Sequence, residues 1–88
     1  MNLVIDDELW NIVKSLINDM TALPVNDNGE VISNQPDYLF ANIYIHLDSS
    51  LKERHHPVVS VRFQSTYDNK YRYYLIDTNY KIYVTSEV

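Results

Sequence analysis

The sequence predicts a small α+β protein in which one N-terminal amphipathic helix packs on a four-stranded, mostly antiparallel sheet, giving two layers. Three observations favour this class. An apolar stripe at helical spacing occurs once, near the N-terminus. Short stretches rich in β-branched and aromatic residues then recur four times. The last three of these stretches are separated only by short turns, which makes them antiparallel neighbours.

The helix is expected over residues 6–20. Its start is well marked, because Asp6 is an N-cap residue and Asp7 and Glu8 lie at the positive end of the helix dipole. Trp10 falls at the edge of the apolar stripe, and we expect it to clamp the helix onto the sheet; an exposed binding anchor is the alternative. The stripe itself consists of Leu9, Ile12, Val13, Leu16, Ile17 and Met20.

Residues 21–37 are expected to form a loop or a short hairpin. This stretch contains the only glycine of the chain and two of its three prolines. The run from Asn26 to Gly29 is typical of a tight turn, since Asn and Gly tolerate a positive φ. Val25 and Val31 flank this turn and can pair across it, whereas an irregular loop is the alternative.

The strands are expected at about 38–47, 58–66, 71–77 and 80–85. The first gives the strongest pattern, because apolar residues alternate without interruption from Leu39 to Leu47. We therefore expect it to be a central or near-central strand, with Leu39 and Ile43 pointing into the core. The segment between the first two strands is polar, and we expect a crossover with one helical turn at about 51–55.

Alternation also predicts which way the other strands direct their side chains. In the second strand Val59 and Phe63 are expected to point inward. In the fourth strand Ile82 and Val84 are expected inward and Tyr83 outward. The third strand leaves two options, because either its odd or its even positions can face the core.

Size and charge limit the classes of protein that fit. With 88 residues the chain is expected to form one domain, residues 1–88. It has no cysteine and no apolar run long enough to cross a membrane, so we expect a cytoplasmic location and no membrane partner. The net charge of −5 is uneven, since residues 1–51 contain eight acidic residues and one basic residue. The first half of the chain is therefore strongly acidic.

No catalytic or cofactor motif is present, so we expect no enzymatic activity, no cofactor and no metal site. His55 and His56 are adjacent, which directs their rings apart in extended structure, and no further ligand motif accompanies them. His46, with Tyr44 and Asp48 two residues to either side, is where a catalytic base would be sought. A single glycine cannot build a phosphate-binding loop.

Two surfaces are candidates for binding. One is the outward face of the sheet, where Tyr and Arg gather, because these residues dominate protein hot spots and also stack on nucleic-acid bases. The other is acidic, since carboxylates can occupy a partner's basic groove in place of phosphates. The candidate protein-binding residues are Asp6, Asp7, Glu8, Asp27, Glu30, Asp37, Tyr44, Arg62, Arg72, Tyr74 and Tyr83.

We therefore expect a small, acidic, non-enzymatic protein that binds another protein, as an inhibitor or immunity-type partner using its acidic residues. One alternative is a single-stranded nucleic-acid-binding module that uses the sheet face, with Lys81 included. Nucleic acid is the less favoured partner, because the net charge is negative and no RNP-like motif is present. Another alternative is a homodimer or larger homo-oligomer, formed through an uncovered face or an unpaired edge strand.

Overall fold

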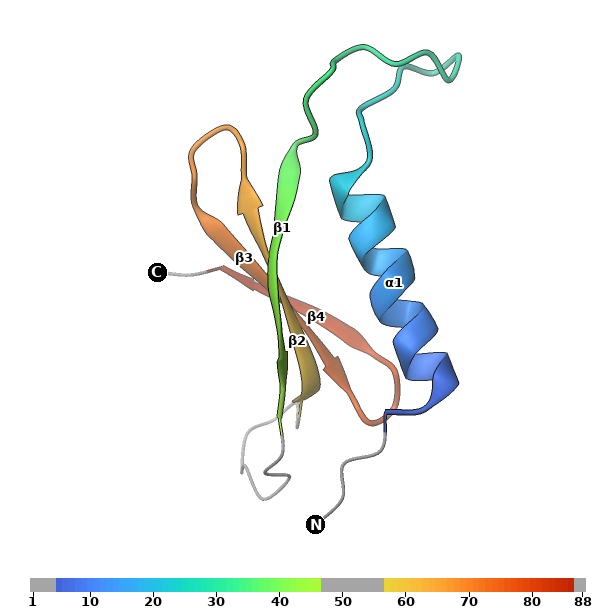
Figure 1. Ribbon diagram of the computed structural model, residues 1–88, viewed down its shortest axis with the longest axis vertical. Helices are drawn as coiled ribbons and strands as arrows, with labels where there is room; N and C mark the ends of the chain where they lie inside the picture. Colours follow the sequence, from blue (N-terminus) through green and yellow to red (C-terminus); the bar gives the residue numbers. More distant parts are fainter. Residues whose placement is uncertain (1–4, 47–56, 87–88) are drawn as a thin grey trace.

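A computed structural model describes residues 5–46 and 57–86 of the chain and confirms the α+β class. One helix lies on one face of a four-stranded antiparallel sheet, so the fold has two layers (Figure 1). The predicted helix and all four predicted strands are present. Their bounds are α1 (Asp7–Thr21), β1 (Tyr38–Ile45), β2 (Pro57–Ser65), β3 (Tyr71–Asp77) and β4 (Ile82–Ser86).

The helix α1 begins where the sequence predicts. The Asp6 carboxylate accepts a hydrogen bond from the Leu9 backbone N–H at 2.8 Å, which makes Asp6 the N-cap. Leu9 and Val13 are buried against the sheet. Trp10, however, is 44% exposed, so the expectation that it clamps the helix onto the sheet is wrong. Successive helical residues are rotated by about 100°, so Trp10 points sideways when Leu9 points into the core.

The strand order is β1-β2-β3-β4, and each strand is antiparallel to the next. β1 is therefore an edge strand, and the expectation of a central position is wrong. Its alternating sequence reflects a strand with one face toward the helix, and an edge strand has such a face just as a central strand does. Short turns join β2, β3 and β4 in chain order.

A β-bulge interrupts β1 between Phe40 and Asn42. After the bulge Ile43 packs against the core, as predicted. Before the bulge Phe40 shares the helix-facing side with Phe63, whereas Leu39 is 49% exposed on the opposite face. The prediction that Leu39 points into the core is therefore wrong, because one extra residue in the strand shifts the alternation by one position.

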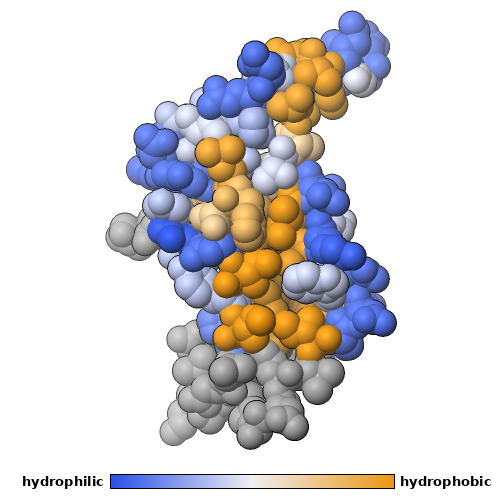
Figure 2. Space-filling view, viewed as in Figure 1, coloured by the Kyte–Doolittle hydropathy of each residue, from blue (hydrophilic) through white to orange (hydrophobic). Residues whose placement is uncertain are grey.

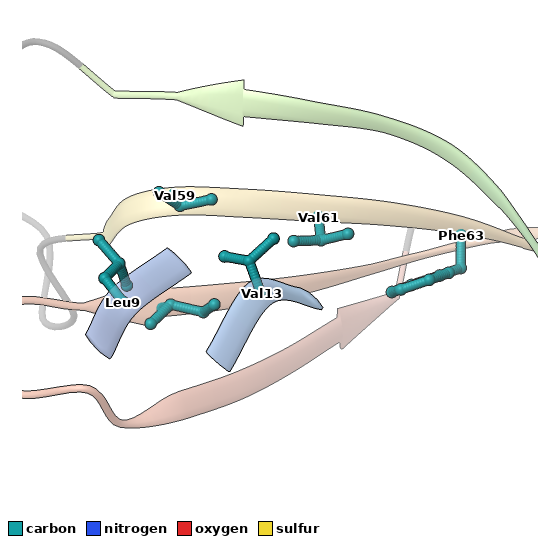
Figure 3. Close-up of a cluster of buried hydrophobic side chains, with 6 residues drawn as sticks. Leu9, Val13, Val59, Val61 and Phe63 are labelled. Atoms are coloured by element: carbon teal, nitrogen blue, oxygen red, sulfur yellow. The ribbon is translucent and has the colours of Figure 1, made fainter. Parts of the chain in front are cut away.

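The core lies between α1 and the middle of the sheet (Figure 3). Phe63 is fully buried, and the rings of Phe40 and Tyr74 meet it edge-on with centroids 6.4 and 5.6 Å away. Tyr74 lies opposite Val61, so the even positions of β3 point toward the helix, which decides the phase that the sequence leaves open. The buried apolar residues among those described are Leu9, Val13, Val59, Val61, Phe63 and Ile76.

The β3–β4 turn also anchors the helix. Tyr80 has a φ of 65°, and its backbone N–H donates to the Asp77 carbonyl oxygen at 3.1 Å. The Tyr80 hydroxyl donates to the Asp6 carboxylate, so the turn is tied to the N-terminus of α1. This hydrogen bond lowers the pKa of Asp6 and raises the pKa of Tyr80 to about 12. The contact holds the helix over the sheet at one end.

Residues 22–37 connect α1 to β1 and extend past the end of the helix (Figure 1). Val25 and Val31 form an antiparallel bridge, which confirms the predicted pairing across the turn. Gly29 has a φ of 80°, a conformation that favours glycine. The Asn26 side-chain oxygen accepts hydrogen bonds from two backbone N–H groups of the turn, at 2.9 and 3.0 Å. The segment is therefore a short hairpin.

Within residues 5–46 and 57–86, no helix combines the length and the apolar character needed to cross a bilayer. Three expectations fall outside the described residues: the helical turn at about 51–55, the adjacent His55 and His56, and the continuation of the first strand to Leu47.

Candidate interaction surface

The side of the sheet that points away from α1 is called the open face below. Its members follow from the register, because residues directly opposite one another on neighbouring antiparallel strands share a face. Among the described elements, no helix covers it. The open face consists of Leu39, Asn42, Tyr44, Ser60, Arg62, Gln64, Tyr71, Tyr73, Leu75, Tyr83 and Thr85.

Arg62 lies at the centre of the open face, on β2. Its guanidinium carbon is 3.5 Å from the ring centroid of Tyr71 and 5.8 Å from that of Tyr73. Tyr73 is directly opposite Arg62 in the register, and Tyr71 is two residues away on the same face. Cation–π attraction between the guanidinium group and these rings fixes their positions. The result is an aromatic and cationic cluster that exists before any partner binds.

Asn42 and Tyr44 extend this cluster onto β1. Asn42 lies opposite Arg62, and its side-chain N–H donates to the Tyr44 hydroxyl at 2.8 Å. The Tyr44 ring is exposed. Because its hydroxyl is already held, Tyr44 presents a ring in a fixed orientation, and little side-chain entropy would be lost on binding.

The structure separates the predicted Tyr and Arg candidates into two groups. Three are on the open face, namely Tyr44, Arg62 and Tyr83. Arg72 and Tyr74 occupy even positions of β3 and point to the helix side instead. There the Arg72 guanidinium carbon lies 5.1 Å from the Tyr38 ring centroid, and a hydrogen bond with Tyr74 raises the pKa of Arg72. These two residues therefore belong to the rim of the core.

Tyr71 and Tyr73 are the open-face residues that sequence reasoning missed. Both phases of β3 carry aromatic residues, so alternation within the strand gives no direction. The pairing of β3 with β2 decides it, since β2 has an unambiguous pattern with Arg62 pointing away from the helix. A register between the two strands, deduced from the short turn at residues 66–70, is the signal that identifies them.

The acidic candidates at the N-terminus of the chain lie in the first turn of α1. Asp7 and Glu8 are exposed there. The Asp6 carboxylate, in contrast, is engaged by the Leu9 N–H and the Tyr80 hydroxyl. Asp6 therefore has a structural role, which leaves Asp7 and Glu8 as the carboxylates that are presented to a partner at this end.

The remaining acidic candidates are far from the first turn of the helix. Asp27 and Glu30 are exposed on the hairpin beyond the other end of α1, whose 15 residues span about 22 Å. The Asp37 carboxylate accepts a hydrogen bond from the Tyr67 hydroxyl at 2.8 Å, which raises the pKa of Tyr67. The six predicted acids therefore form separate groups at opposite ends of the molecule.

His46 contacts a serine that the sequence does not single out. Its Nε2 atom and the Ser60 Oγ atom are within hydrogen-bond distance. A serine beside a histidine is the beginning of a nucleophile and base pair, but Ser60 is buried, so a substrate cannot reach its hydroxyl. The contact therefore links the end of β1 to β2. Within the described residues, no group of three or more His, Cys, Asp or Glu residues could hold a metal ion.

Exposed apolar surface is extensive for so small a protein. Figure 2 shows it along the length of one side, between helix and sheet, and on the segment beyond α1. Six apolar residues are buried among those described, whereas twelve large apolar or aromatic residues are exposed. Monomeric proteins rarely expose large contiguous apolar patches unless these are interaction sites. The exposed residues are Trp10, Leu23, Val25, Val31, Ile32, Leu39, Phe40, Tyr44, Ile45, Tyr67, Ile82 and Val84.

Comparisons with protein-family models, with curated proteins and with solved structures find no match to this chain. Function is therefore inferred from the chemistry of the described surface, because a fold alone does not specify one.

Proposed function

We propose that this chain is a cytoplasmic, non-enzymatic interaction protein that binds another protein through the open face. The observation that carries this proposal is the preformed cluster in which the Arg62 guanidinium carbon lies 3.5 Å from the Tyr71 ring centroid and 5.8 Å from that of Tyr73. Tyr and Arg are the residue types that contribute most binding energy in protein interfaces, and a rigid cluster loses little entropy on binding.

The charge of the open face favours a protein over a nucleic acid as the partner. Arg62 is the one charged residue among the eleven residues of the open face. A surface that follows a phosphate backbone needs several cations, and the net charge of −5 adds long-range repulsion. Arg72, which would supply a second cation, points to the other side of the sheet.

The acidic residues support a secondary role in such a complex. Asp7 and Glu8 lie at one end of α1 and Asp27 and Glu30 beyond the other, so they cannot line one short groove together. Exposed charges outside the contact surface act by long-range attraction, which chiefly raises the association rate, and their effect falls with salt. An inhibitor or immunity-type protein would use its acids in this way against a target that is basic around its contact site.

Affinity capture with matched variants tests the proposal. The tagged full chain is incubated with lysate of its source organism, with and without nuclease, and retained proteins are identified by mass spectrometry. The Arg62→Lys variant keeps the charge but loses the planar stack, and Tyr44→Ser removes the exposed ring. Tyr67→Ser is the control, because Tyr67 is an exposed tyrosine outside the open face.

We expect a specific protein to be retained by the wild type and by Tyr67→Ser, and to be lost by both open-face variants. Retention should not depend on nuclease. If folded Arg62→Lys and Tyr44→Ser variants retain the same protein as the wild type, the open face is not the binding surface. Nucleic acid recovered in place of protein, with affinity that falls steeply with salt, would replace the proposed partner class.

A further inference from the structure

Within the described residues, the free edge of β4 carries no charged residue, no proline and no bulge, three of the features by which natural sheets prevent edge association. β4 spans Ile82–Ser86, with the sequence Ile-Tyr-Val-Thr-Ser, and it contains no charged residue and no proline. It lies at one end of the strand order, and among the described strands it pairs only with β3. Edge strands are usually protected by charges, prolines, bulges or a covering element.

The opposite edge of the sheet is protected in one of these ways. β1 carries the bulge between Phe40 and Asn42, which breaks the regular spacing of its backbone groups. The pairing of β3 with β4 is regular along its whole length, from Ile76 opposite Ile82 to Arg72 opposite Ser86. Of the two edges, β4 is therefore the one that presents a regular row of backbone donors and acceptors.

The positions of these backbone groups follow from the hydrogen-bond pattern. The Asp77 N–H donates to the Lys81 carbonyl oxygen at 3.0 Å, so these two residues form a hydrogen-bonded pair. Hydrogen-bonded and non-hydrogen-bonded pairs alternate in an antiparallel ladder, so Ile82, Val84 and Ser86 direct their N–H and C=O groups away from β3. Three successive even positions thus offer both groups to another strand.

Apolar side chains accompany this free edge. Ile82 and Val84 lie on the helix-facing side, opposite Ile76 and Tyr74, and both are exposed. The reason is geometric: strands are spaced about 4.8 Å apart, so one helix of about 10 Å diameter cannot cover all four strands. The apolar side of the sheet therefore continues beyond the helix as an exposed apolar margin, formed by Ile82 and Val84 of β4.

We propose that β4 pairs with β4 of a second copy of this chain, antiparallel and about a twofold axis at Val84, so that two four-stranded sheets become one continuous sheet. In this register Val84 opposes itself, Tyr83 opposes Thr85, and Ile82 opposes Ser86. All six outward-directed residues of the two copies then exchange backbone hydrogen bonds. No like charges oppose each other in this register. Tyr83 and Thr85 lie on the open face, and an aromatic residue opposite a β-branched one is a favourable cross-strand pair.

We infer a second copy as the occupant of this edge, because in that register Val84 meets Val84 at the axis and no charged residue of β4 is brought against another. The two apolar margins meet at the axis. Both copies of α1 lie on the same side of the joined sheet as these margins, and each margin is partly covered by the other copy. The interface is short, with five residues per copy, and falls well below the roughly 800 Å² per partner of tight complexes. The expected dimer is therefore weak and depends on concentration.

Charge-pair variants test the register. In Val84→Lys the two like charges face each other at the axis, and the dimer dissociation constant should rise about tenfold or more. Val84→Glu should do the same. An equimolar mixture of the two variants should recover dimer formation, because Lys and Glu then oppose each other. Sedimentation equilibrium from micromolar to near-millimolar protein measures each association, and circular dichroism confirms the fold.

The matched control is the same substitution at Val31, an exposed valine on the hairpin far from β4. Val84 is 53% exposed and Val31 is 60% exposed, so Val31→Lys changes the charge of the protein equally without touching the edge. It should leave dimer formation unchanged. Equal loss of dimer in both variants would mean that overall charge, and not the β4 edge, controls association.

A cysteine variant tests the same contact in a chain close to the wild type. The protein contains no cysteine, so Val84→Cys introduces a single thiol. Opposed residues of a hydrogen-bonded antiparallel pair have Cα atoms about 5.5 Å apart, which a disulfide can bridge. We expect Val84→Cys to form a covalent dimer faster than Val31→Cys under mild oxidation.

Three results would overturn the inference: a wild type that stays monomeric throughout this range, a mixture of Val84→Lys and Val84→Glu that fails to associate, or equal crosslinking rates for the two cysteine variants. A wild type that stays monomeric would mean that the β4 edge is available to a strand of another protein and not to a second copy. Failure here is distinguishable from failure of the proposed function, because edge pairing extends the sheet in its own plane and leaves the open face uncovered.

Discussion

The two faces of the sheet bury their side chains with different residue types. On the helix side, aliphatic and Phe side chains such as Val61 and Phe63 reach complete burial because a second layer covers them. On the open face no described layer exists, and Tyr71 and Tyr73 are half-buried against the Arg62 guanidinium group. Tyr and Arg suit this position because each has a large apolar body and a polar end that stays in water.

Burial on the helix side is supplied by another element, whereas burial on the open face is supplied by neighbours within the sheet. Substitutions on the helix side should therefore lower stability strongly, and substitutions on the open face should affect binding more than stability.

The largest effect is expected at Phe63. Phe63→Ala removes a fully buried ring and leaves a cavity, so the free energy of unfolding should fall by about 3–5 kcal/mol. Phe40→Ala is the matched control, since Phe40 faces Phe63 across the strands but is exposed, and about 1–2 kcal/mol is expected. Urea denaturation measures both. Equal losses would mean that the helix side is not closed as described.

The next effect concerns the contact that holds the helix over its face. Tyr80→Phe removes the hydrogen bond to Asp6, so the urea midpoint at pH 7 should fall. Tyr67→Phe removes a similar bond to Asp37 between loop residues and should lower the midpoint less, because no helix depends on it. A larger loss for Tyr67→Phe would contradict the anchoring role.

The stabilisation by this bond should also depend on pH. The pKa of Asp6 is lowered in the folded state, so its contribution is present above the ordinary value of 3.8 and is lost as pH falls through the lowered pKa. The pKa of Tyr80 is raised to about 12, so its contribution is present below the ordinary value of 10.0 and is lost as pH rises through about 12. The difference in urea midpoint between wild type and Tyr80→Phe should therefore be largest between about pH 4 and pH 10.

A smaller effect is expected at the centre of the open face. Arg62→Lys keeps the charge but loses the stacked guanidinium plane, so the free energy of unfolding should fall by about 1 kcal/mol or less. Thermal unfolding detects this change. A loss as large as that of Phe63→Ala would mean that the open face contributes to stability as strongly as the helix side does.

The smallest effect on stability is expected for Tyr44→Ser. The ring is exposed and its hydroxyl bonds only to the neighbouring Asn42, so the free energy of unfolding should change by about 0.5 kcal/mol or less. Partner binding should nevertheless be lost. A variant that is strongly destabilised, or one that binds normally, would break the division between the two faces.

Local chemistry made several elements predictable. The N-cap at Asp6, the apolar stripe of α1, and the turn at Asn26–Gly29 each depend on residues close together in the sequence, and all three are confirmed. The candidate surface was predictable only in part. Tyr44 and Arg62 lie in strands with a readable pattern, whereas the direction of Tyr71 and Tyr73 depends on pairing with a neighbouring strand.

The sequence by itself determined the fold class, the number of elements and their approximate bounds, because helical and strand periods and turn residues act over a few positions. Only the tertiary structure decided that β1 is an edge strand with a bulge, that Trp10 is exposed, and that Arg72 points to the core side. These features depend on which strand lies beside which, and on how much of a four-stranded sheet one helix can cover. Neither quantity is encoded in any short stretch of residues.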